Sequence, residues 1–344
     1  MRCSTLPTAS SNSPAPHVAG STTVNAPLPQ PEGGAAGAAI RTLDLVKQYG
    51  SITALAGLTM TVGRGEVFGF LGPNGAGKTT AVKLLVGLTR PTAGQAWLLD
   101  VPIGDRVTRR RIGYLPELFR YQDWLTAREV LALHCALADI PAAERPREIE
   151  HTLETVGLAA RGGDRVGTFS KGMQQRLGLG VALLGRPEVV FLDEPTSALD
   201  PVGRRDVREI VRGLKARGAT VFLNSHLLSE VELVCDRVAI VDKGRVVALG
   251  SLHEVIGGAQ AVRVRLTGLN GAGHAALHSY GDVRHEGDWV TVTGLDADAV
   301  PDLVADLVRA GVQIHAVEPR HDSLEDRFLQ LLTRPDDAAV EDTS

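Results

Sequence analysis

The sequence predicts an α/β domain on a mainly parallel sheet, followed by a small α+β domain. Short apolar runs at Val67–Leu71, Glu188–Asp193 and Ala219–Leu223 have the composition of strands buried on both faces, and helical patterns separate them. A glycine-rich loop, Gly72–Thr79, follows the first run and opens a helical pattern. The order strand, glycine loop, helix is typical of a phosphate-binding α/β domain.

The elements of the first domain follow in chain order. Alternating residues from Ile40 predict a half-buried strand, and Leu58–Val62 predicts a second one before Val67–Leu71. Helical spacing then starts at Lys78. The residues from about 124 to 186 predict a mostly helical insert, after which strands return at 188–193, 219–223 and 238–241. This alternation favours a mainly parallel sheet.

The second unit has shorter elements. Ala261–Thr267 and Trp289–Thr293 alternate as strands do, and Pro301–Ala310 has the apolar spacing of an amphipathic helix. A strand at Val312–Val317 and a helix at Ser323–Leu332 complete it. His274 and His278 are spaced four apart, but a third ligand is lacking, so a metal site is not expected there.

Composition narrows the function classes. A net charge of −4 over 344 residues gives no basic surface of the kind that neutralises phosphates, so nucleic acid is not an expected partner. Cys3, Cys135 and Cys235 have spacings that suit neither zinc nor a disulfide framework, which predicts a reducing cytoplasm. No apolar run approaches the roughly 18 residues that a membrane span needs. We therefore expect no direct membrane span, and any membrane role would depend on a partner.

Four segments are predicted along the chain. Residues 1–39, rich in Ala, Pro and Ser, are expected to form a disordered tail, because they cannot bury enough apolar surface. Residues 40–257 form the first domain, with a helical subdomain at about 115–186. Residues 258–334 form the small domain, and 335–344 an acidic tail.

The glycine loop has the residue types that a triphosphate needs. Glycines at 72, 75 and 77 let the main chain wrap closely around phosphate oxygens. Lys78 can place a cation on the β and γ phosphates, and Thr79 can offer its hydroxyl to Mg²⁺ at a helix N-terminus. A chance glycine turn before a helix is the alternative for such a motif alone.

A second acidic motif lowers the weight of that alternative. Four apolar residues precede Asp193, which puts its carboxylate at the edge of the sheet where open α/β folds bind ligands. Asp193 can hold Mg²⁺, and Glu194 can polarise a water for attack on the γ phosphate. A salt bridge is the competing role for Glu194, but adjacent carboxylates after an apolar strand favour a cation partner.

A third segment, Phe169-Ser-Lys-Gly-Met-Gln-Gln-Arg176, resembles the Leu-Ser-Gly-Gly-Gln signature of the nucleotide-binding subunits of ABC transporters. Ser170 and Gly172 match that signature, whereas Lys171 and Met173 depart from it. The Ser-Lys-Gly-Met version is similar to that of the subfamily paired with ABC-2 type permeases, which includes drug-resistance exporters. The resemblance covers about residues 41–255 and implies a phosphate-loop (P-loop) NTPase fold of the ABC type.

Further positions follow from this resemblance. Tyr49 stands where the family places an aromatic ring against adenine, and Glu117 stands where a loop that senses the γ phosphate carries Gln. Ser197-Ala-Leu-Asp200 resembles the loop that crosses between paired subunits. His226 stands at the family's switch histidine.

Together these motifs imply ATP and Mg²⁺ as cofactors and three groups of site residues. The catalytic pair is Glu194 and His226, and the metal ligands are Thr79, Asp193 and Glu117. The nucleotide-binding residues are Tyr49, Gly72, Pro73, Asn74, Gly75, Ala76, Gly77, Lys78, Thr79, Thr80, Glu117, Ser170 and Gly172.

The resemblance implies an ATP-hydrolysing subunit that powers an ABC-2 type exporter. It works as a homodimer, in which Ser170 and Gly172 of one chain close over the nucleotide held by Lys78 and Thr79 of the other. A membrane permease is the expected partner, which places the chain on the cytoplasmic face of the cell membrane. An ABC importer ATPase and a soluble cassette ATPase without a permease are the alternatives.

Overall fold

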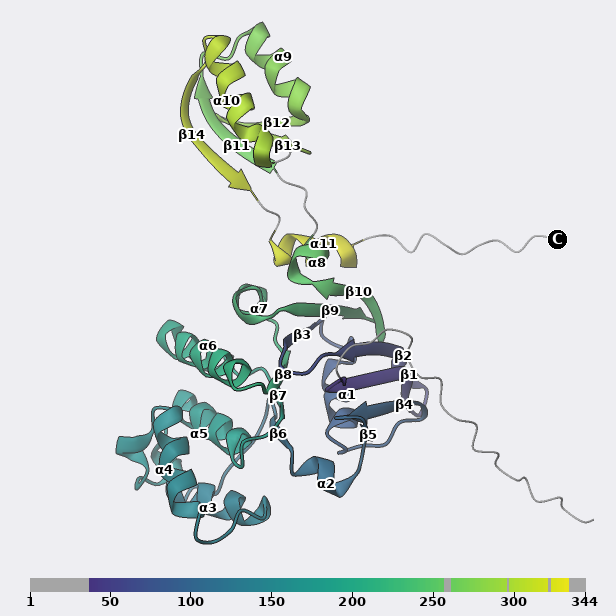
Figure 1. Cartoon of the computed structure of the whole chain (residues 1–344), viewed down its shortest axis with the longest axis vertical. Coiled ribbons are helices and arrows are strands. Elements are labelled where there is room, and N and C mark those ends of the chain that lie inside the picture. Colours follow the sequence, from purple (N-terminus) through teal and green to yellow (C-terminus); the bar gives the residue numbers. More distant parts are fainter. Residues whose placement is uncertain (1–36, 257–260, 296, 321–322, 334–344) are drawn as a thin grey trace, which may run out of the picture. The chain divides into compact units, whose positions relative to one another are not determined.

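The computed structural model describes residues 37–256, 261–295, 297–320 and 323–333. Residues 1–36 of the predicted tail 1–39 lie outside these ranges, as does the predicted acidic tail 335–344, and residues 37–39 lead into the first strand. Three sheets and their helices make up the described part of the chain (Figure 1). No helix of the described residues is both long and apolar enough to cross a bilayer.

The central sheet has six strands in the order β10-β9-β3-β8-β7-β6. β3, β6, β7, β8 and β9 run parallel, and β10 is antiparallel at one edge. The strands are β3 (Val67–Leu71), β6 (Ile112–Leu115), β7 (Val189–Asp193), β8 (Thr220–Asn224), β9 (Arg237–Asp242) and β10 (Arg245–Ser251). The predicted α/β class with a mainly parallel sheet is confirmed.

A second sheet of four antiparallel strands covers one face of the central sheet, in the order β2-β1-β4-β5. Its strands are β1 (Ile40–Tyr49), β2 (Ile52–Val62), β4 (Ala93–Leu98) and β5 (Val101–Pro102), and α1 (Lys78–Leu85) packs with them; α2 (Arg106–Arg109) precedes β6. β7 illustrates how both faces are filled: Val189 and Phe191 join this side, while Val190 and Leu192 join the opposite core. Alternate burial of this kind explains its continuous apolar run.

Helices cover the other face. These are α3 (Ala127–Leu137), α4 (Arg145–Thr155), α5 (Lys171–Leu183) and α6 (Pro201–Ala216), together with the shorter α7 (Leu228–Val234) and α8 (Leu252–Ile256). α3 starts with a capping box in which Thr126 and Glu129 bond each other's backbone amides. The 3₁₀ turns Ala159–Arg161 and Val166–Thr168 join α4 to α5.

The third sheet belongs to the small domain and has the order β12-β13-β11-β14. Its elements are β11 (Ala261–Thr267), α9 (Gly271–Tyr280), β12 (Asp282–Glu286), β13 (Trp289–Thr293), the 3₁₀ turn Ala297–Ala299, α10 (Val300–Arg309) and β14 (Gln313–Arg320). Both helices cover one face of the sheet (Figure 1). The β-α-β-β-α-β order is that of a split βαβ fold. The sequence patterns predicted β11, β13, α10 and β14 but not α9 or β12.

The last helix, α11 (Leu324–Leu332), packs away from the unit to which the sequence analysis assigned it. Leu324 is fully buried in the first domain, in the hydrophobic core between the central sheet and its helices. There it shares a cluster with Val231 and Val255. Arg327 Nε also donates a hydrogen bond to the carbonyl oxygen of Val255 at 3.1 Å. Because α11 follows β14 in the sequence, the helix was predicted to belong to the small domain. Its apolar face packs instead against α7 and α8 of the first domain.

This packing predicts an asymmetric effect of two substitutions in α11. Leu324→Ala should lower the free energy of unfolding by about 2 to 4 kcal/mol, because it opens a cavity in a filled core. Leu329→Ala is the matched control, since that side chain is 55% exposed in the same helix. Urea denaturation of the full-length chain measures both. Equal effects of the two changes would contradict the assigned packing of α11.

Candidate functional site

The glycine loop joins the buried strand β3 to α1 and depends on backbone conformations that favour glycine. Gly77 is the N-cap of α1 with φ of +98°, and a Cβ there would lie 2.2 Å from the carbonyl oxygen of Ala54. A Cβ on Gly72 would lie 2.3 Å from the carbonyl oxygen of Val241. Among the residues that the structure describes, no side chain caps α1. The amide groups at its start are therefore available to an anion.

Lys78 closes this loop from the inside. Its Nζ donates hydrogen bonds to the carbonyl oxygens of Gly72 at 2.7 Å and Pro73 at 3.1 Å. Burial lowers the pKa of Lys78, while the carboxylates of Glu194, Asp193 and Glu117 act in the opposite direction. Among the described residues, Lys78 makes hydrogen bonds only to carbonyl oxygens of its own loop. Its ammonium group could therefore leave those carbonyls and bind phosphate oxygens instead.

Asp193 ends β7 and is completely buried. Burial raises its pKa to about 6; the hydrogen bond from Asn224 and the charge of Lys78 oppose that shift, and Glu117 and Glu194 add to it. Its Oδ2 atom and the Oδ1 atom of Asn224 are buried oxygens without a hydrogen-bond partner among the described residues. Unpartnered buried acceptors are costly, so this pair fits a hydrated cation such as Mg²⁺.

Glu194 turns the chain sharply after β7, because its φ of +54° lies in the left-handed region that non-glycine residues seldom adopt. Surrounding bonds hold this conformation. Its amide donates to the carbonyl oxygen of Asn224 at 2.9 Å, and its own carbonyl accepts from Gln175 Nε2 at 3.2 Å and from Ser197 Oγ at 3.1 Å. These bonds fix Glu194 directly after the C-terminal end of β7, where it lines a groove.

The Glu194 carboxylate meets His226 there. Glu194 Oε2 lies 2.7 Å from His226 Nδ1, and the imidazole remains exposed while the carboxylate is nearly buried. Whether Nδ1 donates or accepts in this contact depends on the histidine tautomer. A carboxylate paired with an imidazole beside a phosphate-binding loop can accept a proton from water and orient a phosphate oxygen.

A groove of about 550 Å³ brings most of the predicted site residues together. Its lining includes the glycine loop, Glu117 from the segment after β6, and Glu194 and His226 from two neighbouring strand ends. The lining residues are Ile52, Thr53, Ala54, Asn74, Gly75, Gly77, Lys78, Thr79, Thr80, Glu117, Glu194, Asn224 and His226. Ile52, Thr53, Ala54 and Asn224 line the groove without having been predicted as site residues, and Asn224 is the one of them that ends a strand of the central sheet. The only signal for it was a polar residue closing an otherwise apolar strand.

Ser170 and Gly172 do not line that groove. They lie in a second one of about 660 Å³, together with Ala198, Leu199 and Asp200. Ser170 caps α5 by accepting a hydrogen bond from the Met173 amide at 3.3 Å. The predicted signature residues and the loop that they should close over therefore belong to different surfaces of one chain.

Tyr49 also stands apart from the groove lining. Its ring is 48% exposed, and Lys47 Nζ lies 4.7 Å from the ring centre. An exposed aromatic ring at the start of the β1–β2 turn can stack on a flat base.

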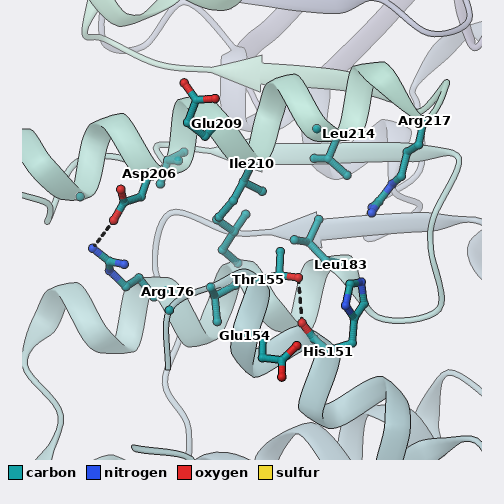
Figure 2. Close-up of a pocket in the computed structure, with 16 residues that line it drawn as sticks. His151, Glu154, Thr155, Arg176, Leu183, Asp206, Glu209, Ile210, Leu214 and Arg217 are labelled. Carbon is teal, nitrogen blue, oxygen red and sulfur yellow. Dashed lines mark hydrogen bonds and ion pairs between the residues drawn. The ribbon is translucent and has the colours of Figure 1, made fainter. Parts of the chain in front are cut away.

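A third groove, of about 460 Å³, lies between α4, α5 and α6, and none of the predicted site residues lines it (Figure 2). The ion pair of Arg176 with Asp206, at 2.9 Å, crosses one end, while Arg217 and His151 lie at the other (Figure 2). Ser170 is the N-cap of α5, and Asp200 is the N-cap of α6. The ion pair therefore joins the two helices whose N-cap residues line the second groove.

Comparison with known proteins gives a consistent picture. The ABC transporter family model matches residues 55–197. A Nostoc protein described as an uncharacterised ABC transporter ATP-binding protein is 40% identical over 86% of this chain and 90% of its own length. A bacitracin transport ATP-binding protein of Bacillus licheniformis is 35% identical over 85% and 97%. A fluoroquinolones export ATP-binding protein of Mycobacterium tuberculosis is 38% identical over 82% and 88%.

Solved structures agree with the fold. The ATP-binding subunit of an ABC transporter, 32% identical, superimposes with a TM-score of 0.59 over 63% of this chain and 91% of that one. A dimeric ATP-binding cassette in a post-hydrolysis state, bound to ADP and Pi, gives a TM-score of 0.58 over 62% and 99% at 24% identity. The predicted fold of the first domain, an ABC-type P-loop NTPase, is confirmed.

The buried carboxylate predicts a measurable conflict between stability and function. The pKa of Asp193 is about 6 in the fold against an ordinary 3.8, so its contribution to stability is present below about pH 4 and is lost as pH rises through 6. Asp193→Asn should therefore stabilise the ligand-free chain at pH 7.5 by about 1 to 3 kcal/mol. Calorimetry from pH 5 to 8 measures this, with the exposed Asp282→Asn as control. A variant that is no more stable than the parent at pH 7.5 would contradict the argument.

Proposed function

Because the chain belongs to the family of ABC transporter ATP-binding proteins, we propose that it binds ATP with Mg²⁺, hydrolyses it and so powers a membrane exporter. The observation that carries this proposal is the Glu194–His226 pair, which lines the same groove as Lys78 and Thr79. A protein that only bound the nucleotide would need the loop but not this pair. The pair therefore supports hydrolysis.

Each residue of the groove has a separate task in this proposal. The amides from Asn74 to Thr80 bind the phosphates, and Lys78 exchanges its two carbonyl partners for β and γ phosphate oxygens. Thr79 and Asp193 would hold Mg²⁺, which supplies charge neutralisation for the triphosphate. Glu117 lines the same groove and is proposed as a further ligand.

Proton transfer belongs to the strand ends. Glu194 polarises a water for in-line attack on the γ phosphate, and its left-handed backbone keeps the carboxylate aimed at that point. His226, whose Nδ1 lies 2.7 Å from Glu194 Oε2, contacts the γ phosphate when nucleotide is bound. Tyr49 is proposed to stack on the adenine.

The two separated grooves support a dimer as the working form. Ser170 and Gly172 of one chain would close over the nucleotide in the loop groove of its partner, because neither residue lines that groove in its own chain. Only the closed dimer then makes all the contacts with ATP, so ATP stabilises the closed dimer by mass action. Hydrolysis removes the contacts between the nucleotide and the second chain. Closing and opening would drive the transporter.

We further propose an ABC-2 type permease as the membrane partner and the cytoplasmic membrane face as the location. The relatives named for bacitracin transport, linearmycin resistance and fluoroquinolones export support export over import. The segment after Glu117 exposes large apolar side chains: Leu118 is 87%, Trp124 69% and Leu137 70% exposed. Several large, exposed apolar side chains in one segment can mark an interaction site, so this segment is the proposed permease-docking surface.

Substitution of the proposed base tests hydrolysis. Glu194→Gln should keep Mg²⁺-dependent ATP binding within a few-fold and lower kcat by about 10²-fold or more, because the amide cannot accept the proton. Phosphate release from the full-length chain, alone and with its permease, measures turnover. Substitution of the exposed Glu209 by Gln serves as control. Turnover close to that of the parent would refute the assigned role of Glu194.

The docking surface gives a separate prediction. Leu118→Asp should reduce copurification with the permease by about 10-fold or more, since it places a charge in an apolar contact, and nucleotide binding should not change. Leu88→Asp is the matched control, because Leu88 is 65% exposed outside the segment. If both variants copurify with the permease as the parent does, the surface lies elsewhere.

A further inference from the structure

Asn224 holds an unusual place next to the catalytic carboxylates. It ends β8, which pairs in parallel with β7 so that Asn224 stands directly opposite Asp193. Both residues are buried: Asp193 is 0% exposed and Asn224 is 2% exposed. The remainder of β8, Thr220–Leu223, is also buried, and its last three residues are apolar. A polar amide at the end of this strand therefore needs a reason beyond packing.

The amide makes one directed contact and leaves one acceptor. Asn224 Nδ2 donates a hydrogen bond to Asp193 Oδ1. Asp193 Oδ2 and Asn224 Oδ1 are buried and have no hydrogen-bond partner among the described residues. Two such acceptors in one place cost free energy unless a cation or its water ligands serve them.

The charge balance explains why an amide suits this position. Lys78 is influenced by three carboxylates, those of Glu194, Asp193 and Glu117. A fourth carboxylate at position 224 would add repulsion, and an aliphatic residue would leave Asp193 Oδ1 without its donor. Asparagine supplies a donor to the carboxylate and an acceptor to its surroundings without a net charge.

We propose that Asn224 is a positioning residue for Mg²⁺. Its Nδ2 group fixes the Asp193 carboxylate so that Oδ2 remains free for the metal, and its Oδ1 atom accepts a hydrogen bond from a water bound to that metal. This inference rests on the proposed function, because it assigns a further residue to the same nucleotide site.

A purely structural role for Asn224 is the competing explanation, and the backbone argues against it. β7 and β8 are already paired at five positions from Val189 to Asp193, and the Glu194 amide bonds the main-chain carbonyl of Asn224 rather than its side chain. Neither contact requires an amide side chain. Loss of the side chain should therefore affect the metal more than the fold.

The test compares Asn224→Leu, which has a similar size and no polar atoms, with Asn224→Ser, which keeps a small donor and acceptor. A fluorescent ATP analogue is bound to the full-length chain at pH 8 while Mg²⁺ is titrated, and the titration is repeated with EDTA. In Asn224→Leu the Mg²⁺ concentration for half-maximal binding should rise about 10- to 100-fold, as for other residues that orient metal ligands. For Asn224→Ser, the Mg²⁺ concentration for half-maximal binding should lie between the values for the parent and for Asn224→Leu.

Binding in EDTA should remain within about twofold of the parent for both variants. Unchanged Mg²⁺ dependence in both variants would overturn the proposal, and so would an equal loss of binding with and without Mg²⁺, which indicates a structural role. Parent and Lys78→Ala chains run in parallel. If the parent fails to bind the analogue, or Lys78→Ala binds it equally well, the proposed function fails instead.

Discussion

The structure depends on keeping one carboxylate, Asp193, completely buried at the end of a parallel strand. Desolvation makes this ionised group unfavourable in the ligand-free fold, which is why its pKa rises to about 6. The neighbouring lysine and the amide of Asn224 offset only part of that cost. Under the proposed function, a Mg²⁺ ion that binds together with the phosphates would offset the rest of this cost.

Glu194 shows the same compromise in the backbone. A left-handed glutamate is strained, yet bonds from Gln175 on α5, Ser197 and the β8 carbonyl hold it in place. Gln175 lies on the helix that Ser170 caps, so the carboxylate is tied to the surface proposed to face the partner subunit. The ion pair between Arg176 and Asp206 joins that helix to α6. Movement of α5 would thus reach the catalytic end of the sheet through short, direct contacts.

Much of this site could be predicted because its chemistry is local in sequence. The loop from Gly72 to Thr79 and the carboxylates after β7 are each contiguous, and each motif follows from what a triphosphate requires. Asn224 was missed because its partner lies 31 residues away and only strand pairing brings the two together. α11 was assigned to the wrong neighbour for a related reason: its apolar face is readable in the sequence, but the core that it fills is not. The limits of the small domain otherwise remain a prediction.

The central claim is that one chain contains only half of the working ATP site. Sedimentation velocity tests it most directly. The Glu194→Gln chain is compared with the double variant Glu194→Gln/Gly172→Asp, each with and without Mg²⁺ and ATP. The account predicts that ATP converts Glu194→Gln from monomer to dimer, and that the added carboxylate abolishes the dimer while the monomer still binds nucleotide. A dimer that forms equally well with Gly172→Asp, or a chain that stays monomeric with saturating ATP, would contradict it.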